Sequence, residues 1–314
     1  MEDDKYKKIV EAAKLYYLHD YSQQEIASQL HISRPTVSRL LQQAKEEGIV
    51  QIQIIDRCED SKQLEFDLQH KFGLQTAIVA PGLLHDEHLI MQHLGKLGAE
   101  YLHQTIKDGD IIGITWGRTL YQVASSLKKK TMVKNVQLVQ LNGGVSHSEQ
   151  QTYDSETLHL FGQAFNAASY HLPLPAIVDH VVVKQAIEAD RHIRKLLDMG
   201  KQANIAVFTV GVPLIGNLLF QVGYLAEQEM EIISEQATGD IAARFFNVEG
   251  RICHEPLNAR TIGIELEELK HKEKSILIAG GASKVDGIKG ALHAKYANVL
   301  ITDQLTAQML LQPV

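Results

Sequence analysis

From residue 76 onward, short apolar runs alternate with stretches of helical periodicity, and this alternation restricts the fold more than any other feature of the chain. Strands buried on both faces of a parallel sheet appear as continuous apolar runs, and the helical stretches between them are the crossovers. The alternation therefore predicts an α/β domain with a mostly parallel, Rossmann-like sheet. The predicted strands are residues 77–79, 111–114, 136–141, 205–210, 276–279 and 299–301.

Four of these runs end in loops of glycine and small polar residues. In an open α/β sheet, loops at the carboxyl ends of the strands meet at one crevice, where backbone N–H groups and helix N-termini attract anions. Taken singly, each glycine is explained by a tight turn. Together, and with Arg118 and Lys284 available, the loops predict a site for a small phosphorylated ligand. The loops are Thr115–Thr119, Asn142–Gly144, Gly211 after Thr209, and Gly280–Lys284.

The segment 239–246 leaves two interpretations open. Asp240 supplies either a carboxylate that orients ligand hydroxyls or the cap of a helix. Arg244 supplies either a second cation for the ligand or a partner on the surface. The sequence pattern does not decide between them, and Asp240 stays a candidate ligand-binding residue.

The first fifty residues carry two short amphipathic helices separated by a tight turn. Ser22 and Glu25 have the spacing of a capping box at the start of the first helix. Ser33 caps the second, and Pro35 is tolerated in its first turn, where the N–H groups have no partner within the helix. His31 stands at the turn, where glycine is common. This arrangement predicts a helix-turn-helix. The predicted inward-facing residues are Ile26, Ala27, Leu30, Val37, Leu40, Leu41 and Ala44.

The outer face of the second helix carries hydroxyl and basic side chains, with no acidic residue between Ile32 and Lys45. The net charge is −7, yet residues 1–57 hold eight Lys and Arg against nine Asp and Glu, so most of the acidity lies elsewhere. Such a face suits contacts with phosphates and base edges in the major groove of DNA. A plain helical hairpin, a protein partner, and surface roles for single residues are the alternatives. The predicted DNA-binding residues are Ser22, Gln23, Ser33, Arg34, Pro35, Thr36, Ser38 and Arg39.

The boundary between two domains is expected soon after these helices. Alternating residues 49–54 predict a strand, as a small wing or a domain edge. Residues 56–63 are polar and unpatterned and are the predicted linker. In the next helix, Leu64, Leu68 and Phe72 form a stripe suited to docking or dimer contacts. The predicted domains are residues 1–56 and 57–314.

Composition excludes several classes of protein. A 314-residue chain that is 45% hydrophobic and 22% charged is not disordered. No apolar run approaches the ~18 residues of a membrane span, and the acidic N-terminus is unlike a secretory signal. The two cysteines, Cys58 and Cys253, are far apart, which fits a reducing cytoplasm. No P-loop, zinc-protease or serine-hydrolase motif is present. His85, His88 and His93 are most simply explained as a solvated helix face, so no metal or cofactor is expected.

Five segments resemble, in order, the SorC family of bacterial sugar-responsive transcriptional regulators. They are YSQQEIASQLHISRPTVSRLLQQAKEEGIVQI (21–52), GDIIGITWGRTLYQVA (109–124), VQLNGGVS (139–146), GDIAARFF (239–246) and GGASKVDGIKGAL (280–292). The resemblance spans essentially the whole chain. Four further stretches resemble family members that repress genes of deoxyribonucleoside catabolism: LPLP (172–175), DRHI (190–193), GKQANIAVFTVG (200–211) and KYANVLITDQ (295–304).

The resemblance implies a DNA-binding domain followed by an effector domain related in fold to sugar-phosphate isomerases. It also implies a homodimer or homotetramer that binds a partly palindromic operator. A phosphorylated sugar such as deoxyribose 5-phosphate would release this oligomer from the DNA. It implies no enzymatic activity; the alternative is a sugar-phosphate-metabolising enzyme with an appended DNA-binding domain. By position, the implied effector-binding residues are Thr115, Gly117, Arg118, Thr119, Asn142, Gly143, Gly144, Gly211, Asp240 and Lys284.

One position departs from the pattern of the deoxyribonucleoside-responsive members. They have a lysine before the two glycines, where this chain has Asn142. A lysine amine can capture an open-chain aldehyde as a Schiff base, whereas an asparagine amide can only hydrogen-bond. Deoxyribose 5-phosphate would therefore bind here without a covalent bond, or another sugar phosphate is the effector.

Overall fold

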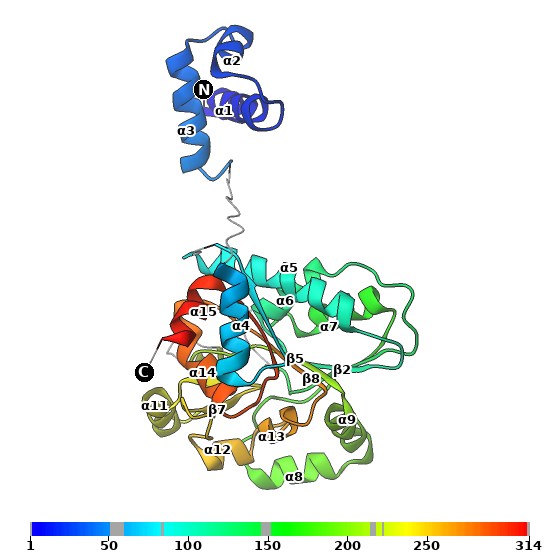
Figure 1. The fold of residues 1–314 in the computed structure, drawn as a ribbon. Coiled ribbons are helices and arrows are strands. Elements are labelled where there is room, and N and C mark those ends of the chain that lie inside the picture. Colours follow the sequence, from blue (N-terminus) through cyan, green and yellow to red (C-terminus); the bar gives the residue numbers. More distant parts are fainter. Residues whose placement is uncertain are drawn as a thin grey trace. The chain divides into compact units, whose positions relative to one another are not determined.

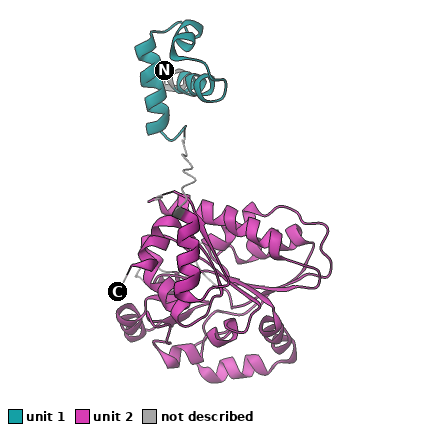
Figure 2. Cartoon of the chain, in the orientation of Figure 1, with its two compact units in different colours: residues 1–55 teal, residues 56–314 magenta. Residues whose placement is uncertain are grey.

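The computed structural model describes residues 2–50, 60–82, 85–145, 152–213, 218–221 and 223–312. The chain divides into two compact units, residues 1–55 and residues 56–314 (Figure 1, Figure 2). Among the residues in these ranges, no helix is long and apolar enough to cross a lipid bilayer.

The first unit consists of helices α1 (Glu2–Tyr17), α2 (Gln23–Gln29) and α3 (Arg34–Glu46). Ser22 and Glu25 form the predicted capping box, because the Glu25 N–H donates to Ser22 Oγ (3.3 Å) and the Ser22 N–H donates to Glu25 Oε2 (2.8 Å). His31, in the turn, has φ +52°, a left-handed conformation that explains why glycine is common there. The buried core of the unit is Ile9, Ala12, Ala13, Ile26, Val37, Leu40, Leu41 and Ala44.

The second unit is built on one seven-stranded sheet in which every neighbouring pair is parallel. The strand order is β1-β9-β8-β5-β2-β3-β4. After β2 the chain moves outward to β3 and β4, then returns to place β5 on the other side of β2. The carboxyl ends of β2 and β5 therefore flank the switch point of the sheet, where such folds bind ligands. The strands are β1 (Thr76–Ala80), β2 (Ile111–Ile114), β3 (Gln137–Gln140), β4 (Ala168–Tyr170), β5 (Ile205–Phe208), β8 (Lys274–Ile278) and β9 (Val299–Asp303).

Helices cover both faces of this sheet (Figure 1). Helices α4 (Asp60–Phe72), α14 (Val285–His293) and α15 (Gln304–Leu311) share one buried cluster with one face of the strands. Helices α5 (Glu87–Thr105), α6 (Arg118–Ser126) and α7 (Asp154–Phe165) share a second cluster with the other face. The remaining elements are α8 (Val181–Ala189), α9 (Arg191–Gln202), α10 (Leu218–Gln221), α11 (Glu227–Gln236), the hairpin β6 (Gly239–Ile241) and β7 (Arg244–Phe246), α12 (Glu255–Ala259), α13 (Leu266–Leu269) and the short 3₁₀ helix η1 (Ala282–Lys284).

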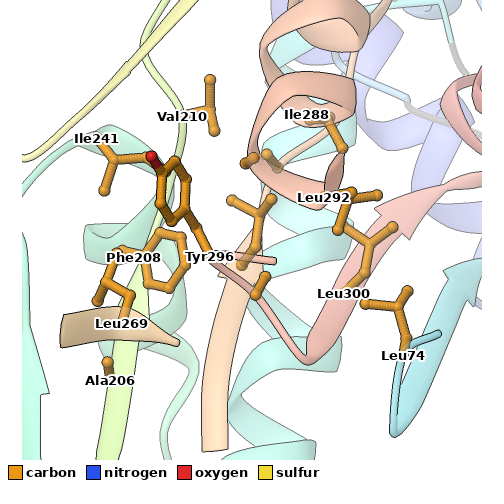
Figure 3. Packing of buried hydrophobic residues seen from close by; sticks show 14 of the residues in the cluster. Leu74, Ala206, Phe208, Val210, Ile241, Leu269, Ile288, Leu292, Tyr296 and Leu300 are labelled. Atoms are coloured by element: carbon orange, nitrogen blue, oxygen red, sulfur yellow. The ribbon is translucent and has the colours of Figure 1, made fainter. Parts of the chain in front are cut away.

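Alternate residues of the central strands supply the two clusters. On β5, Ala206 and Phe208 face the first cluster, whereas Ile205 and Val207 face the second. Figure 3 shows Phe208 in the first cluster with residues from β9 and α14. The hydroxyl of the buried Tyr296 donates to the Gly250 carbonyl (2.7 Å), so its burial leaves no polar group unsatisfied.

Several predictions about elements need correction. The stripe on α4 packs into its own unit, because Leu68 and Phe72 are buried in the first cluster, so it is not a surface for docking. Residues 60–63, predicted as linker, are the first turn of α4. Strand β4 was missed because it is short and two of its three residues are exposed. Ile49 and Val50 form a bend and not the start of a strand; residues 51–54 of that prediction lie outside the described residues.

Candidate functional site

The first candidate surface is the exposed face of α3. Ser33 and the predicted contact residues on the helix itself are exposed, while Val37 and Leu40 of the same helix are buried. Ser33 Oγ accepts the Thr36 N–H (3.4 Å) and also pairs with Thr36 Oγ1 (2.8 Å), so both hydroxyls are tied to the helix start. The exposed contact residues are Ser22, Ser33, Arg34, Pro35, Thr36, Ser38 and Arg39; Gln23 is half-buried.

Replacing Arg34 or Arg39 by alanine is expected to weaken binding of the full chain to DNA by about 1–3 kcal/mol if the arginine contacts bases. A DNA fragment selected by the wild-type protein from a random pool serves as the target in a titration. Lys14→Ala is the matched control, because it removes one exposed positive charge from α1. Undiminished affinity in both arginine variants would show that this face does not read DNA.

The second candidate site is a cavity of about 170 Å³ in the second unit. It lies at the carboxyl ends of β2, β3, β5 and β8, at the switch point of the sheet. The hairpin β6–β7 and the first turns of α5 complete its wall. Its lining residues are Glu87, Met91, Thr115, Trp116, Gly117, Arg118, Thr119, Asn142, Thr209, Val210, Gly211, Leu219, Asp240, Ala242, Ala243, Gly280 and Lys284.

One part of the cavity is suited to an anion. Helix α6 begins after Gly117, whose φ of +136° suits glycine, and no side chain caps its first N–H groups. The η1–α14 segment begins after Gly281 (φ +97°), again without a side-chain cap. Free N–H groups and the positive end of the helix dipole together attract a phosphate or carboxylate.

Two cations belong to the same part of the cavity. Arg118 is exposed, whereas Lys284 is partly buried. Burial and the neighbouring Arg118 guanidinium lower the pKa of Lys284 to about 8, although Asp240 and Glu87 act in the opposite direction. A bound anion would stabilise the charged form of Lys284 and offset its repulsion by Arg118.

Two of the lining residues have a buried polar atom without a partner among the residues that the structure describes. Asn142 is 1% exposed, and its amide donates to the Gly143 carbonyl (3.2 Å) while its Oδ1 accepts no hydrogen bond in the described part of the chain. Thr209 Oγ1, at the end of β5, is likewise buried without a partner there. Such groups cost free energy unless something satisfies them. Ligand hydroxyls at these positions would do so.

Asp240 faces the cavity from β6, so the alternative that it caps a helix is wrong. Gly211 and Asp240 exchange two backbone hydrogen bonds (2.9 and 3.2 Å). A Cβ atom on Gly211 would overlap Oδ1 of Asp240, which explains the glycine after this strand. The pairing brings the carboxylate next to the end of β5.

Eight of the ten predicted effector-binding residues therefore line one cavity, while Gly143 and Gly144 do not. Both glycines are used in backbone pairing instead. The Gly143 N–H donates to the Ile262 carbonyl (3.2 Å), the Gly144 N–H donates to the Leu174 carbonyl (2.8 Å), and the Gly144 carbonyl accepts the Ala176 N–H (2.8 Å). Arg244 is also outside the cavity lining and is 1% exposed, so it is neither a cation for the ligand nor a surface partner.

Several lining residues were not predicted as ligand contacts. Trp116, Thr209 and Gly280 stand in or beside the predicted loops and could have been included on that ground. Glu87, Met91 and Leu219 come from helices distant in sequence, and Ala242 and Ala243 form a hairpin turn. Nothing in their local sequence indicates a site, because only the packing of these elements brings them to the cavity.

The chain matches known proteins over its whole length. Residues 56–312 match the family described as "Putative sugar-binding domain", and residues 11–47 match Sigma-70, region 4. The deoxyribonucleoside regulator of Bacillus subtilis (strain 168) is 52% identical over 310 residues, which cover 99% of each chain. The sorbitol operon regulator of Klebsiella pneumoniae is 34% identical, over 98% of this chain and 99% of the relative. The crystal structure of the full-length regulator SorC from Klebsiella pneumoniae superposes with a TM-score of 0.74 at 31% identity, covering 97% of this chain and 98% of that one.

A helix-turn-helix followed by a parallel α/β sugar-binding domain defines a ligand-responsive transcriptional regulator, and both predicted folds are confirmed. The chain belongs to the SorC family of sugar-binding transcriptional regulators.

Proposed function

We propose that this regulator represses genes for deoxyribonucleoside catabolism and leaves its operator when deoxyribose 5-phosphate occupies the cavity of the second unit. The observation that carries the proposal is that one cavity is lined by two kinds of group. Arg118, Lys284 and two helix starts without side-chain caps suit a phosphate, while Asn142 Oδ1 and Thr209 Oγ1 lack partners that sugar hydroxyls would supply. The relative that is 52% identical is named a deoxyribonucleoside regulator, which favours this sugar.

The sugar would be held by hydrogen bonds alone. Asn142 cannot form a Schiff base, and Lys284 belongs to the part suited to phosphate. We propose that a homodimer or homotetramer formed through the second unit pairs two α3 helices across the half-sites of an operator. The effector must then bind better to the subunit arrangement that does not fit the operator, since otherwise no population shifts.

Thermal unfolding against a set of sugar phosphates tests the effector. A ligand at 100 times its dissociation constant adds about 2.7 kcal/mol to the free energy of unfolding. For a unit of this size we expect the midpoint to rise by about 5–11 °C with deoxyribose 5-phosphate, and less with ribose 5-phosphate or a hexose phosphate. If another phosphate gives the largest rise, the proposed effector is wrong. If no phosphate shifts the midpoint, the proposed site is wrong.

We propose binding without turnover. An isomerase-like enzyme would need a base acting on a ligand carbon, for which Asp240 is the candidate in the cavity. Incubating deoxyribose 5-phosphate with the full chain and following it by NMR distinguishes the two functions: a regulator leaves the sugar unchanged, and accumulation of an isomer would identify an enzyme.

A further inference from the structure

A buried arginine beside the cavity has a role that the proposed function does not use. Arg244 is 1% exposed, and its planar guanidinium is surrounded by acceptors from the single segment 258–265. Arginine can hold several carbonyls in a fixed arrangement, which a lysine cannot reproduce. Its Nε donates to the Ile264 carbonyl (2.8 Å), Nη1 to the Asn258 carbonyl (3.0 Å) and to Asn258 Oδ1, and Nη2 to the carbonyls of Thr261 and Gly263 (3.3 Å each) and to Glu265 Oε1 (2.7 Å).

The segment held by Arg244 lies directly against Asn142. The Ile264 N–H donates to the Leu141 carbonyl (2.7 Å), the Gly143 N–H donates to the Ile262 carbonyl (3.2 Å), and Asn142 and Gly263 form an isolated antiparallel bridge between them. A Cβ atom on Gly263 would lie 2.6 Å from Asn142 Cα, so the two backbones are in close contact. This segment therefore holds the backbone on both sides of Asn142, together with the sheet, where the Leu141 N–H donates to the Ile114 carbonyl (2.8 Å).

On its other side, Arg244 is joined to Asp240 by a tight hairpin. Ile241 pairs with Arg244, which leaves only Ala242 and Ala243 in the turn. Both alanines are left-handed, with φ of +55° and +65°, as a two-residue turn of type I′ requires. A turn this short gives Asp240 little freedom to move relative to Arg244.

We infer that Arg244 is a positioning residue that fixes the distance between Asp240 and Asn142, and thereby the choice among sugars. The inference rests on the proposed function, because it requires a sugar phosphate in the cavity. The groups suited to phosphate belong to α6, η1 and their loops, and the side chain of Arg244 makes none of its hydrogen bonds to those elements. Loss of Arg244 should therefore alter sugar preference much more than phosphate affinity.

The test is calorimetry on the full chain with inorganic phosphate, deoxyribose 5-phosphate and ribose 5-phosphate. Arg244→Lys keeps the positive charge but loses the planar set of N–H donors. We expect its dissociation constant for inorganic phosphate to stay within about twofold of the wild type, while the preference between the two sugar phosphates falls about tenfold, equivalent to about 1.4 kcal/mol. Asn258→Ala removes one acceptor and should reduce the preference less, and Asn258→Asp should restore it.

Lys272→Met is the control. Lys272 is also a buried cation that donates to backbone carbonyls, those of Gly200 (2.9 Å) and Lys201 (2.5 Å), but it lies outside the segment 258–265 and neither partner lines the cavity. This variant should lose stability and keep the sugar preference.

A purely structural role for Arg244 would lower stability in both Arg244→Lys and Lys272→Met and leave the sugar preference intact in both, which would overturn the inference. If Arg244→Lys does not fold, the Asn258 pair decides: equal preference in the alanine and aspartate variants contradicts the inference. Failure of the proposed function appears in the wild type alone, as binding of inorganic phosphate without a gain from either sugar, and the inference then fails with it.

Discussion

Gly143→Ala is expected to destabilise the second unit by about 3 kcal/mol and to lower its unfolding midpoint by about 6–12 °C. A Cβ atom there would lie 2.7 Å from the Leu174 carbonyl oxygen and closer still to the carbonyl of Pro175. Those are backbone atoms, and they can retreat only if the hydrogen bonds of Gly144 to Leu174 and Ala176 break. The neighbouring Asn142 would be displaced as well, so effector affinity should fall together with stability.

Gly200→Ala is the matched control for this prediction. Gly200 is also a buried glycine, but it lies within α9 and its Cβ would meet Leu141 Cδ2 at 3.5 Å, an ordinary contact. Because alanine favours a helix, we expect this variant to be unchanged or up to about 1 kcal/mol more stable. Equal midpoints for the two variants in a thermal melt would contradict the prediction, because they would show that the segment 174–175 moves enough to accommodate the methyl group.

Lys284→Met is expected to weaken binding of a sugar phosphate by about 1.5–3 kcal/mol, or about 10–150-fold, because a charge-assisted hydrogen bond to the phosphate is lost. In the wild type, the depressed pKa of Lys284, about 8, adds a pH dependence. The ammonium is charged below this value and neutral above it, whereas a phosphate with a second pKa near 6 is a dianion throughout this range. Affinity should therefore fall as pH rises, by up to about tenfold between pH 7 and pH 9.

Lys284→Arg distinguishes this titration from other effects of pH. A guanidinium stays charged at pH 9, so affinity in this variant should be nearly independent of pH between 7 and 9. The measurement is a ligand titration by calorimetry at three pH values for each protein. The same decline in wild type and Lys284→Arg would show that a different group titrates, and an unchanged affinity in Lys284→Met would remove Lys284 from the phosphate site.

Local sequence patterns were sufficient to predict much of the fold and the cavity residues that are suited to phosphate. The helix-turn-helix follows from capping residues and helical periodicity, which act within a few residues, as the Ser22–Glu25 box does. Each main strand was visible as an apolar run, because both faces of the sheet are covered. Arg118 and Lys284 could be assigned to one crevice because parallel strands place their carboxyl ends at one edge.

Contacts between distant segments decided the rest. The sequence left Arg244 as either a cation for the ligand or a surface partner, yet six acceptors from residues 258–265 surround its buried side chain. The apolar stripe on α4 was predicted correctly. The pattern did not show that the stripe packs against the sheet of its own unit. The sequence by itself determined which segments become helices, strands and polar loops, since periodicity, caps and turn residues act locally. Only the tertiary structure decided which glycines face a ligand and which face backbone, because that depends on chain segments far apart in the sequence.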